Sequence, residues 1–188
     1  MINRNYTVKF KRKRKHLTDY AQRLRLLSAR KPRFVVRKSL NNVQIQLVTF
    51  EPAGDKTLLT TSSTELTEYG WKAHRGNIPS AYLTGYLCGL KAKKQGIKEA
   101  VLDLGFHKAV PGSSPFAALK GAVDAGLAIP HGESILPTQE TLSGKTISSY
   151  SAKASPLQFS ATLKKGLDPK NLPAHIEEVK KTITTKWH

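Results

Sequence analysis

The sequence predicts an α/β domain in which helices cover a mixed sheet, an antiparallel three-strand meander plus a later strand. Residues 43–50 alternate apolar and polar side chains at the period of a strand. The period changes to that of a helix over residues 76–95, and a short apolar run at 100–104 separates this helix from a second helical stretch. The resulting order, βββαβα, is typical of a layered α/β fold.

Positive charge is concentrated in the first part of the chain. Residues 1–38 hold 14 Lys and Arg side chains against a single acid, Asp19, and so carry +13 of the formal net charge of +18. Six of these cations lie within residues 9–15, where they repel one another unless a polyanion neutralises them. RNA or DNA is the first candidate, because each neutralised phosphate releases condensed counterions. The alternatives are a solvated, disordered tail and a localisation signal.

We therefore expect three regions. Residues 1–30 would form a basic RNA-binding arm with a short helix, residues 31–132 the α/β core domain, and residues 133–188 an extended, partly helical C-terminal extension. The extension is too sparse in apolar residues for a second globular domain, so it is expected to wrap around something. Its last helix would bury Ile176, Val179 and Ile183, and a Ser- and Thr-rich stretch at 138–149 is a further helical candidate.

The arm helix is expected over residues 18–29. Its apolar stripe would pack on the core and consists of Leu17, Ala21, Leu24 and Leu26 or Leu27. Arg23, Arg25 and Arg30 lie off this stripe and would face a polyanion. The helix is expected to end at Lys31, since the residue before a proline is biased away from helical backbone.

The strands of the meander are expected at residues 33–39, 43–50 and 56–63. The alternation in the second strand places Val43, Ile45 and Leu47 on one face. The Asn-rich stretch before this strand favours a turn, because asparagine tolerates positive φ. An antiparallel meander of this kind can leave one of its faces exposed to solvent.

Two helices are expected to cover the sheet. The first runs through residues 76–95, and its small Gly85 and Gly89 would allow close packing on the sheet. The second has Ser114 as its N-cap and continues over residues 116–128.

The sequence gives little support to an enzyme, a metal site or a membrane protein. Cys88 is the only cysteine, which excludes an internal disulfide framework and a cysteine-rich zinc site, fits a reducing compartment and favours a small buried hydrophobe. The six histidines show no ligand spacing, and neither a phosphate-binding loop nor a nucleophile elbow occurs. No apolar run approaches the roughly 20 residues of a membrane span, and no secretory signal is recognisable. We expect a soluble intracellular protein without catalytic residues, metal or cofactor.

One enzymatic alternative remains open, a metal-dependent RNA-processing nuclease. Its carboxylates would be Asp103, at the end of a strand, together with Glu65, Glu68, Asp124 or Glu140. These acids are scattered and unpaired in sequence, and a turn is the simpler role for Asp103. A third possibility is a protein that coats nucleic acid without preference.

RNA contacts are expected from the arm and from the first strand pair. Arginine grips phosphate with two parallel hydrogen bonds, and asparagine or glutamine can read base edges. The turn before the second covering helix would direct free N–H groups at a phosphate, or serve only as a cap. The residues expected to contact RNA are Arg4, Lys9, Lys11, Arg12, Lys13, Arg14, Lys15, Arg23, Arg25, Arg33, Arg37, Lys38, Ser39, Asn41, Asn42, Gln44, His107, Lys108, Ser113 and Ser114.

Four blocks of the sequence resemble a known family. They are residues 33–39 (RFVVRKS), 70–85 (GWKAHRGNIPSAYLTG), 101–105 (VLDLG) and 111–132 (PGSSPFAALKGAVDAGLAIPHG). In this order they resemble the archaeal form of large-subunit ribosomal protein eighteen, a family related to eukaryotic ribosomal protein five. The resemblance runs from about Asn3 to Glu133.

The resemblance implies a structural protein of the large ribosomal subunit in the cytoplasm. It implies binding to 5S rRNA and attachment of this RNA to 23S rRNA in the central protuberance, beside neighbouring large-subunit proteins. It also implies a mixed α/β domain with a basic N-terminal extension and the long C-terminal tail of the archaeal type. By resemblance, residues 9–15 together with Arg33, Arg37, Lys38 and Ser39 fall on RNA-contacting segments. One departure is Leu40, which stands where many members carry asparagine, so that Asn41 comes one position later.

Overall fold

A four-stranded mixed sheet forms the centre of the structure, a computed structural model that describes residues 7–187. The strand order is β3-β2-β1-β4. β1 (Arg33–Lys38) pairs antiparallel with β2 (Val43–Glu51), which pairs antiparallel with β3 (Gly54–Ser62). β4 (Val101–Asp103) lies parallel to β1 on its other side. The predicted α/β class, with a meander joined by a later strand, is confirmed.

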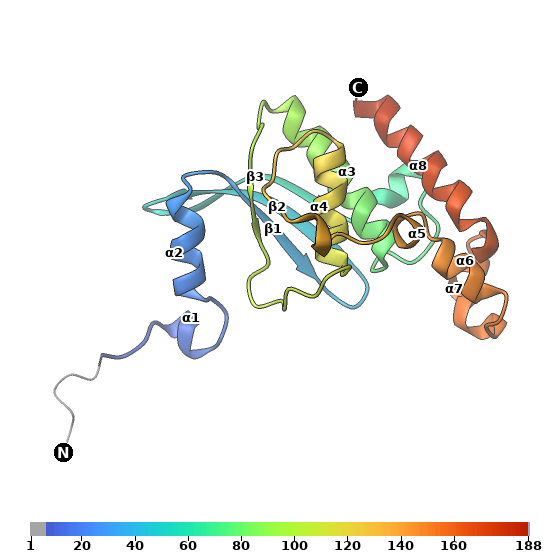
Figure 1. Cartoon of the computed structure of the whole chain (residues 1–188), viewed down its shortest axis with the longest axis horizontal. Coiled ribbons are helices and arrows are strands. Elements are labelled where there is room, and N and C mark those ends of the chain that lie inside the picture. The colour runs from blue at the N-terminus through green and yellow to red at the C-terminus, as the bar shows by residue number, and fades with distance from the viewer. Residues whose placement is uncertain (1–6, 188) are drawn as a thin grey trace, which may run out of the picture.

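One face of the sheet, which we call the inner face, is covered by two helices. Val43, Ile45 and Leu47 lie on it and are completely buried, as their alternation predicted. Helix α3 (Ile78–Lys94) and helix α4 (Ser114–Asp124) pack over this face (Figure 1). Cys88 of α3 is fully buried, and burial raises the pKa of its thiol to about 12.

The glycines of α3 pack against α4 rather than against the sheet, so this part of the prediction was wrong. A Cβ atom on Gly85 would lie 1.9 Å from the carbonyl oxygen of Ala118, and one on Gly89 would lie 2.6 Å from the Cβ of Ala125. Gly121 of α4 makes the reciprocal approach, with the carbonyl oxygen of Tyr82 2.1 Å from its ideal Cβ position. The two backbones therefore touch, and only glycine fits between them.

Helix α4 begins and ends earlier than its sequence predicts. Ser113 occupies the N-cap position, and Ser114 is the first helical residue and is buried. The helix ends at Asp124 because Gly126 has a φ of +102°, which lets the chain turn into an extended segment. Leu127 is buried in this segment rather than on the helix.

Two helices precede the sheet, α1 (Lys11–Arg14) and α2 (Tyr20–Ser28). The carboxylate of Asp19 caps α2 and accepts hydrogen bonds from the next backbone N–H groups at 3.0 and 3.1 Å. The apolar stripe predicted to pack on the core does so only in part: Leu17 and Leu24 are exposed, Leu26 and Leu27 are half-buried, and no residue of α2 is fully buried. Arg23 faces the sheet instead, where it pairs with the carboxylate of Asp55.

The C-terminal extension, which was expected to wrap around something, packs on the core of the preceding domain. Ile176, Val179 and Ile183 of its last helix are buried, which confirms their predicted stripe, and the helix lies against α3. Leu142 and Leu172 join the same core. The remaining elements, all short except the last, are η1 (Glu65–Tyr69), η2 (Glu133–Ile135), α5 (Gln139–Leu142), α6 (Lys145–Ser151), η3 (Pro156–Phe159), α7 (Ser160–Leu163), η4 (Pro169–Asn171) and α8 (Leu172–Trp187).

Aromatic contacts attach α8 to the loop and helix that follow β3. The indole Nε1–H of Trp187 donates to the hydroxyl of Tyr69 at 2.7 Å. The ring of His175 stacks on Trp71 with centroids 5.4 Å apart, and its Nε2 accepts the backbone N–H of Lys72 at 3.2 Å. Burial lowers the pKa of His175, which favours the neutral ring that this acceptor role requires.

None of the helices within residues 7–187 has both the length and the apolarity needed to cross a membrane.

Candidate nucleic-acid interface

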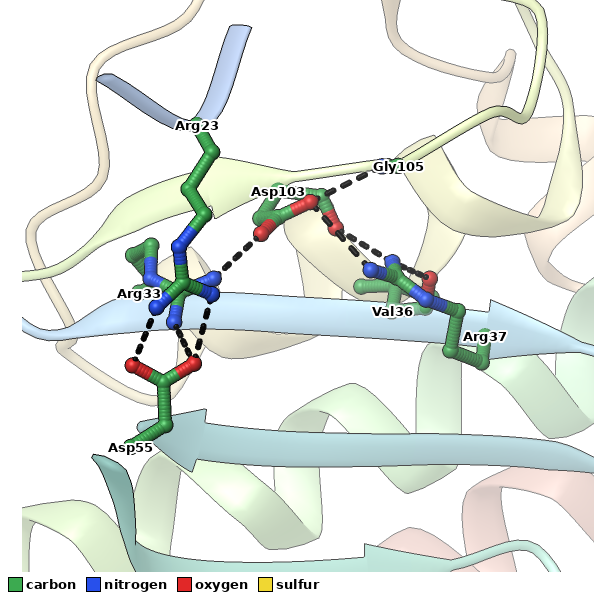
Figure 2. Close-up of polar contacts among 7 residues, drawn as sticks. All are labelled: Arg23, Arg33, Val36, Arg37, Asp55, Asp103 and Gly105. Carbon is green, nitrogen blue, oxygen red and sulfur yellow. Dashed lines mark hydrogen bonds and ion pairs between the residues drawn. The ribbon is translucent and has the colours of Figure 1, made fainter. Parts of the chain in front are cut away.

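The second face of the sheet, which we call the outer face, carries a network of arginines and carboxylates (Figure 2). Arg33 of β1 lies at its centre and is only 5% exposed. Its Nη1 donates to Oδ2 of Asp103 at 2.8 Å, and its Nη2 donates to Oδ2 of Asp55 at 2.6 Å. One buried guanidinium therefore joins β4 on one side of β1 to the β2–β3 hairpin on the other.

Arg23 connects the arm to this network. Its Nη1 and Nη2 donate to the two carboxylate oxygens of Asp55, each at 2.7 Å, in a bidentate pair. Figure 2 shows Arg23 reaching down from α2 to the same carboxylate that Arg33 contacts. The hydrogen bond from Arg23, followed by that from Arg33, lowers the pKa of Asp55 below its ordinary value. Asp55 thus fixes α2 over the outer face.

Asp103 organises the opposite edge of the network. Its Oδ1 accepts the backbone N–H of Gly105 at 2.8 Å, which confirms the turn role predicted for this residue. Arg37 donates from Nη2 to the same oxygen at 3.3 Å and from Nη1 to the backbone oxygen of Asp103 at 3.0 Å. Gly105 has a φ of +59°, and a Cβ there would lie 2.9 Å from Nη2 of Arg37, so a side chain would displace the guanidinium.

A polar cleft of about 710 Å³ separates the arm from the outer face. Arg12 and His16 border it from the arm, Arg37 and Gln46 from the sheet, and His107 from the loop after β4. The structure therefore brings together residues of three segments that are distant in sequence. Arginine, histidine and glutamine side chains, which can bind phosphate and base edges, line the cleft together with the carboxylates of Asp19, Asp55 and Asp103.

The cations of residues 7–38 divide into two sets, those that pair with carboxylates and those that make no ion pair within the described chain. Arg23 and Arg33 have their guanidinium groups directed to carboxylates, so in this structure they hold the interface together. Others are exposed and make no ion pair with any residue between 7 and 187, and Arg12 donates only to the hydroxyl of Thr18. Arg4 lies outside the described residues. The exposed set without ion pairs is Lys9, Lys11, Arg12, Lys13, Arg14, Lys15, Arg25, Arg30 and Lys38.

The remaining predicted contact residues lie elsewhere on the surface. Ser39 closes the β1–β2 hairpin, since its Oγ accepts the backbone N–H of Asn42 and donates to the carbonyl oxygen of the same residue, both at 3.0 Å. Lys38, Ser113 and Ser114 border a separate hollow of about 360 Å³. The remaining four residues are Gln44 on the outer face and Asn41, His107 and Lys108 in surface loops, and all four are exposed.

Sequence reasoning missed Asp55 and Asp103 as organisers of this surface. Asp55 reads as an ordinary turn residue. Nothing in the local sequence reveals that strand register will place its carboxylate beside two arginines, one of them 32 residues earlier.

Three of the carboxylates considered for a nuclease, those of Asp103, Glu65 and Asp124, are engaged by other side chains. Asp103 pairs with two arginines, and Glu65 pairs with Lys91. Asp124 accepts the hydroxyl of Tyr82 at 2.9 Å. Within the described part of the chain, no three His, Cys, Asp or Glu side chains are placed to hold a metal ion.

Comparison with known proteins identifies related sequences across nearly the whole chain. The family described as "Ribosomal large subunit proteins 60S L5, and 50S L18" matches residues 4–99 and 90–132. The chain is also similar to the large ribosomal subunit protein uL18 of Methanococcus maripaludis, with 49% identity over 97% of each chain. This second similarity therefore includes the C-terminal extension as well as the core and the arm.

Proposed function

Because the chain belongs to the family of large-subunit ribosomal proteins 60S L5 and 50S L18, we propose that it binds 5S rRNA and attaches it to 23S rRNA in the central protuberance. Family membership makes it a structural constituent of the large subunit of the cytoplasmic ribosome rather than an enzyme. The identity of the RNA and its place in the subunit are the part that we propose.

The single observation that carries the proposal is the division of the N-terminal cations. Arg23 and Arg33 are fixed on Asp55 and Asp103, while the cations of residues 9–15 project from this fixed base without an ion pair to any residue between 7 and 187. The ion pairs give the surface its shape, and the exposed cations remain available to phosphates. Phosphate contacts of this kind set the register of a protein on RNA and supply most of the affinity.

The outer face adds groups suited to recognition beyond charge. Gln44 is exposed there opposite Arg37 in the β1–β2 register, and Gln46 lines the cleft. Amides beside a guanidinium can hydrogen-bond to base edges or to the ribose 2′-hydroxyl of an RNA strand lying in the cleft. This combination favours a specific RNA over general coating of nucleic acid.

The proposal is tested by removing the free charge while keeping the fold. We expect replacement of the six cations in residues 9–15 by glutamine to weaken 5S rRNA binding about 100-fold or more at low salt, because those phosphate contacts are lost. A filter-binding titration measures the affinity, and a circular-dichroism melt checks folding. Removal of residues 1–15 altogether should give the same result.

A charge-matched control separates local contacts from net charge. Six exposed lysines away from the interface are replaced by glutamine in the control variant, namely Lys93, Lys98, Lys153, Lys164, Lys170 and Lys181. This variant should keep most of its 5S rRNA affinity. Undiminished binding by the arm variant, or equal losses in both variants, would contradict the proposal. Co-sedimentation of wild-type protein and 5S rRNA with the large subunit tests the attachment to 23S rRNA.

A further inference from the structure

A second pocket lies on the other side of the molecule from the arm. It has a volume of about 600 Å³ and is formed by the C-terminal extension and the loop over residues 72–77. Figure 1 shows α6 and α7 beside α8, at the opposite side from α1 and α2. The outer-face cleft shares none of its lining residues with this pocket. We propose that it binds one unpaired nucleotide of ribosomal RNA, with the base inside and the phosphate at the rim.

The walls of the pocket are apolar and include two aromatic rings. Ile147, Leu172 and Pro169 form the aliphatic part. The rings of Tyr150 and Phe159 lie with their centroids 6.4 Å apart and tilted by 58°, so that they present surfaces at an angle to one another. A base buried here would stack on an aromatic face, which is how unpaired bases are commonly held by proteins.

Tyr150 is held in place although it is exposed. Tyr150 is 53% exposed as a whole residue, and its hydroxyl donates to Oε1 of Gln158 at 3.0 Å. This hydrogen bond orients the ring without covering it. The exposed ring surface is therefore available to a ligand.

The charge around the pocket indicates an anion with a flat apolar part. Lys72, Arg75 and Lys165 are among its lining residues, and no Asp or Glu is. None of these three cations makes an ion pair with another residue between 7 and 187. A pocket lined by aliphatic and aromatic groups, with three cations and no carboxylate, complements a nucleotide, whose base is flat and whose phosphate is negative.

Amide groups at the wall would read the edge of the base. Asn41, Asn77 and Gln158 all line the pocket. The side-chain oxygen of Asn77 accepts the backbone N–H of Ser80 at 2.9 Å, which leaves its amide N–H groups as donors. A base in a duplex has this edge paired and its faces stacked, so the occupant must be unpaired. The inference depends on the proposed ribosomal RNA partner but concerns a separate surface.

The pocket can be observed directly by NMR of the full chain. We expect single-stranded pentaadenylate to shift the methyl signals of Ile147 and Leu172, which line the pocket. A pentamer of abasic ribose phosphate keeps the charge and lacks the bases, so it should leave these signals unchanged. Equal shifts with both pentamers, or none with pentaadenylate, would overturn the proposal.

Matched substitutions then locate the binding. Tyr150→Leu and Lys165→Gln should each weaken the affinity of the protein for pentaadenylate about tenfold, as measured from the shift of the Ile147 methyl signal. A loss of this size is expected when one stacked base or one phosphate contact is removed. Leu157→Ala and Lys153→Gln lie in the same extension but outside the pocket lining and should have no effect. Equal losses in the pocket and control variants would contradict the assignment.

Two further outcomes distinguish this inference from the proposed function. Tyr150→Leu should keep normal 5S rRNA affinity, whereas the six-glutamine arm variant should keep the pentaadenylate shift at Ile147. If 5S rRNA binding proved independent of the arm while the Ile147 shift remained, only the proposed function would fail. A peptide of aspartates around one tyrosine that displaced pentaadenylate from the pocket would show a protein-docking site and overturn the nucleotide assignment.

Discussion

Individual carboxylates determine how the cations of this protein are used. Arg33 and Lys38 both lie in β1, yet the first is buried between Asp55 and Asp103 and the second is exposed without an ion pair in the described chain. A buried guanidinium must be paired, because its desolvation otherwise costs several kcal/mol. The positions of the carboxylates therefore determine which arginines are held in ion pairs within the fold.

We expect Asp103→Asn to destabilise the protein by about 3 kcal/mol. The change removes a charge that Arg33 and Arg37 both contact, and it leaves Arg33 buried with only Asp55 as a partner. Urea unfolding followed by circular dichroism measures the loss. The matched control is Glu51→Gln, whose side chain is half exposed and 3.8 Å from Lys56, and whose loss should cost less than about 1 kcal/mol. Similar midpoints for the two variants would show that the network contributes little.

The identity of the cationic residues was predictable from sequence, but their division was not. The cluster in residues 9–15 contains six cations and no acidic residue, so its exposure could be predicted. The sequence around Arg23 and Arg33 does not distinguish these two arginines from the exposed cations. Their carboxylate partners lie in the β2–β3 hairpin and in β4, up to 70 residues away in sequence. Only the register of β1 with its neighbours brings these groups together.

At the scale of elements, close approach rather than apolar area joins the two helices on the inner face. Gly85, Gly89 and Gly121 leave room for backbone where other residues would place a Cβ. The spacing of the glycines in α3 predicted a close contact but not its partner, because a small face fits a helix as well as a sheet. By contrast, the alternation in β2 and the stripe in α8 were sufficient to predict their buried faces.

Gly85→Ala should destabilise the fold by about 3 kcal/mol, which corresponds to roughly 10 °C in Tm for a chain of this size. The new methyl group would lie 1.9 Å from a backbone oxygen of Ala118, so the helices must separate. A thermal melt measures the effect. Gly132→Ala is the control, since the nearest atom to its ideal Cβ is 4.0 Å away. A normal Tm for Gly85→Ala would mean that α4 moves freely.

Helix α2 shows why an apolar stripe can mislead. Leu17, Ala21 and Leu24 have helical spacing, but the sheet face beneath them presents carboxylates rather than hydrocarbon. The ion pair of Arg23 with Asp55 rotates the helix so that Leu24 points to solvent. Local periodicity predicted the helix itself, while the surface against which it packs determined its orientation.

For the whole molecule, the unequal distribution of charge should appear in the salt dependence of RNA binding. Residues 1–38 carry +13 and the other 150 residues only +5. Lys11→Gln should reduce the slope of log K against log salt concentration for 5S rRNA by about 0.7–0.9, as expected for one lost phosphate contact. Lys181→Gln, at an exposed site on α8, should leave the slope unchanged. Equal slopes for the two variants would contradict an arm-centred interface.

The domain organisation was the least predictable feature at this scale. Residues 133–188 contain too few apolar residues to suggest a core of their own, and the structure shows that their buried side chains complete the core of the preceding domain. Ile176, Val179 and Ile183 could be recognised as one face of a helix. The side of α3 that receives them has no distinguishing local pattern, so the contact could be recognised only in three dimensions.

The packing of α8 on α3 has a consequence for the newly made chain. Tyr86 and Thr184 meet through their hydroxyls at 3.2 Å although 98 positions separate them, and Trp187 reaches Tyr69 across 118. During translation, the side of α3 that packs against α8 therefore stays uncovered until the ribosome has synthesised nearly all of the residues that separate the two helices. The nascent protein exposes an apolar helix face together with a strongly cationic N-terminus, a combination that invites aggregation with nucleic acid. A chaperone that shields both until synthesis ends would protect it.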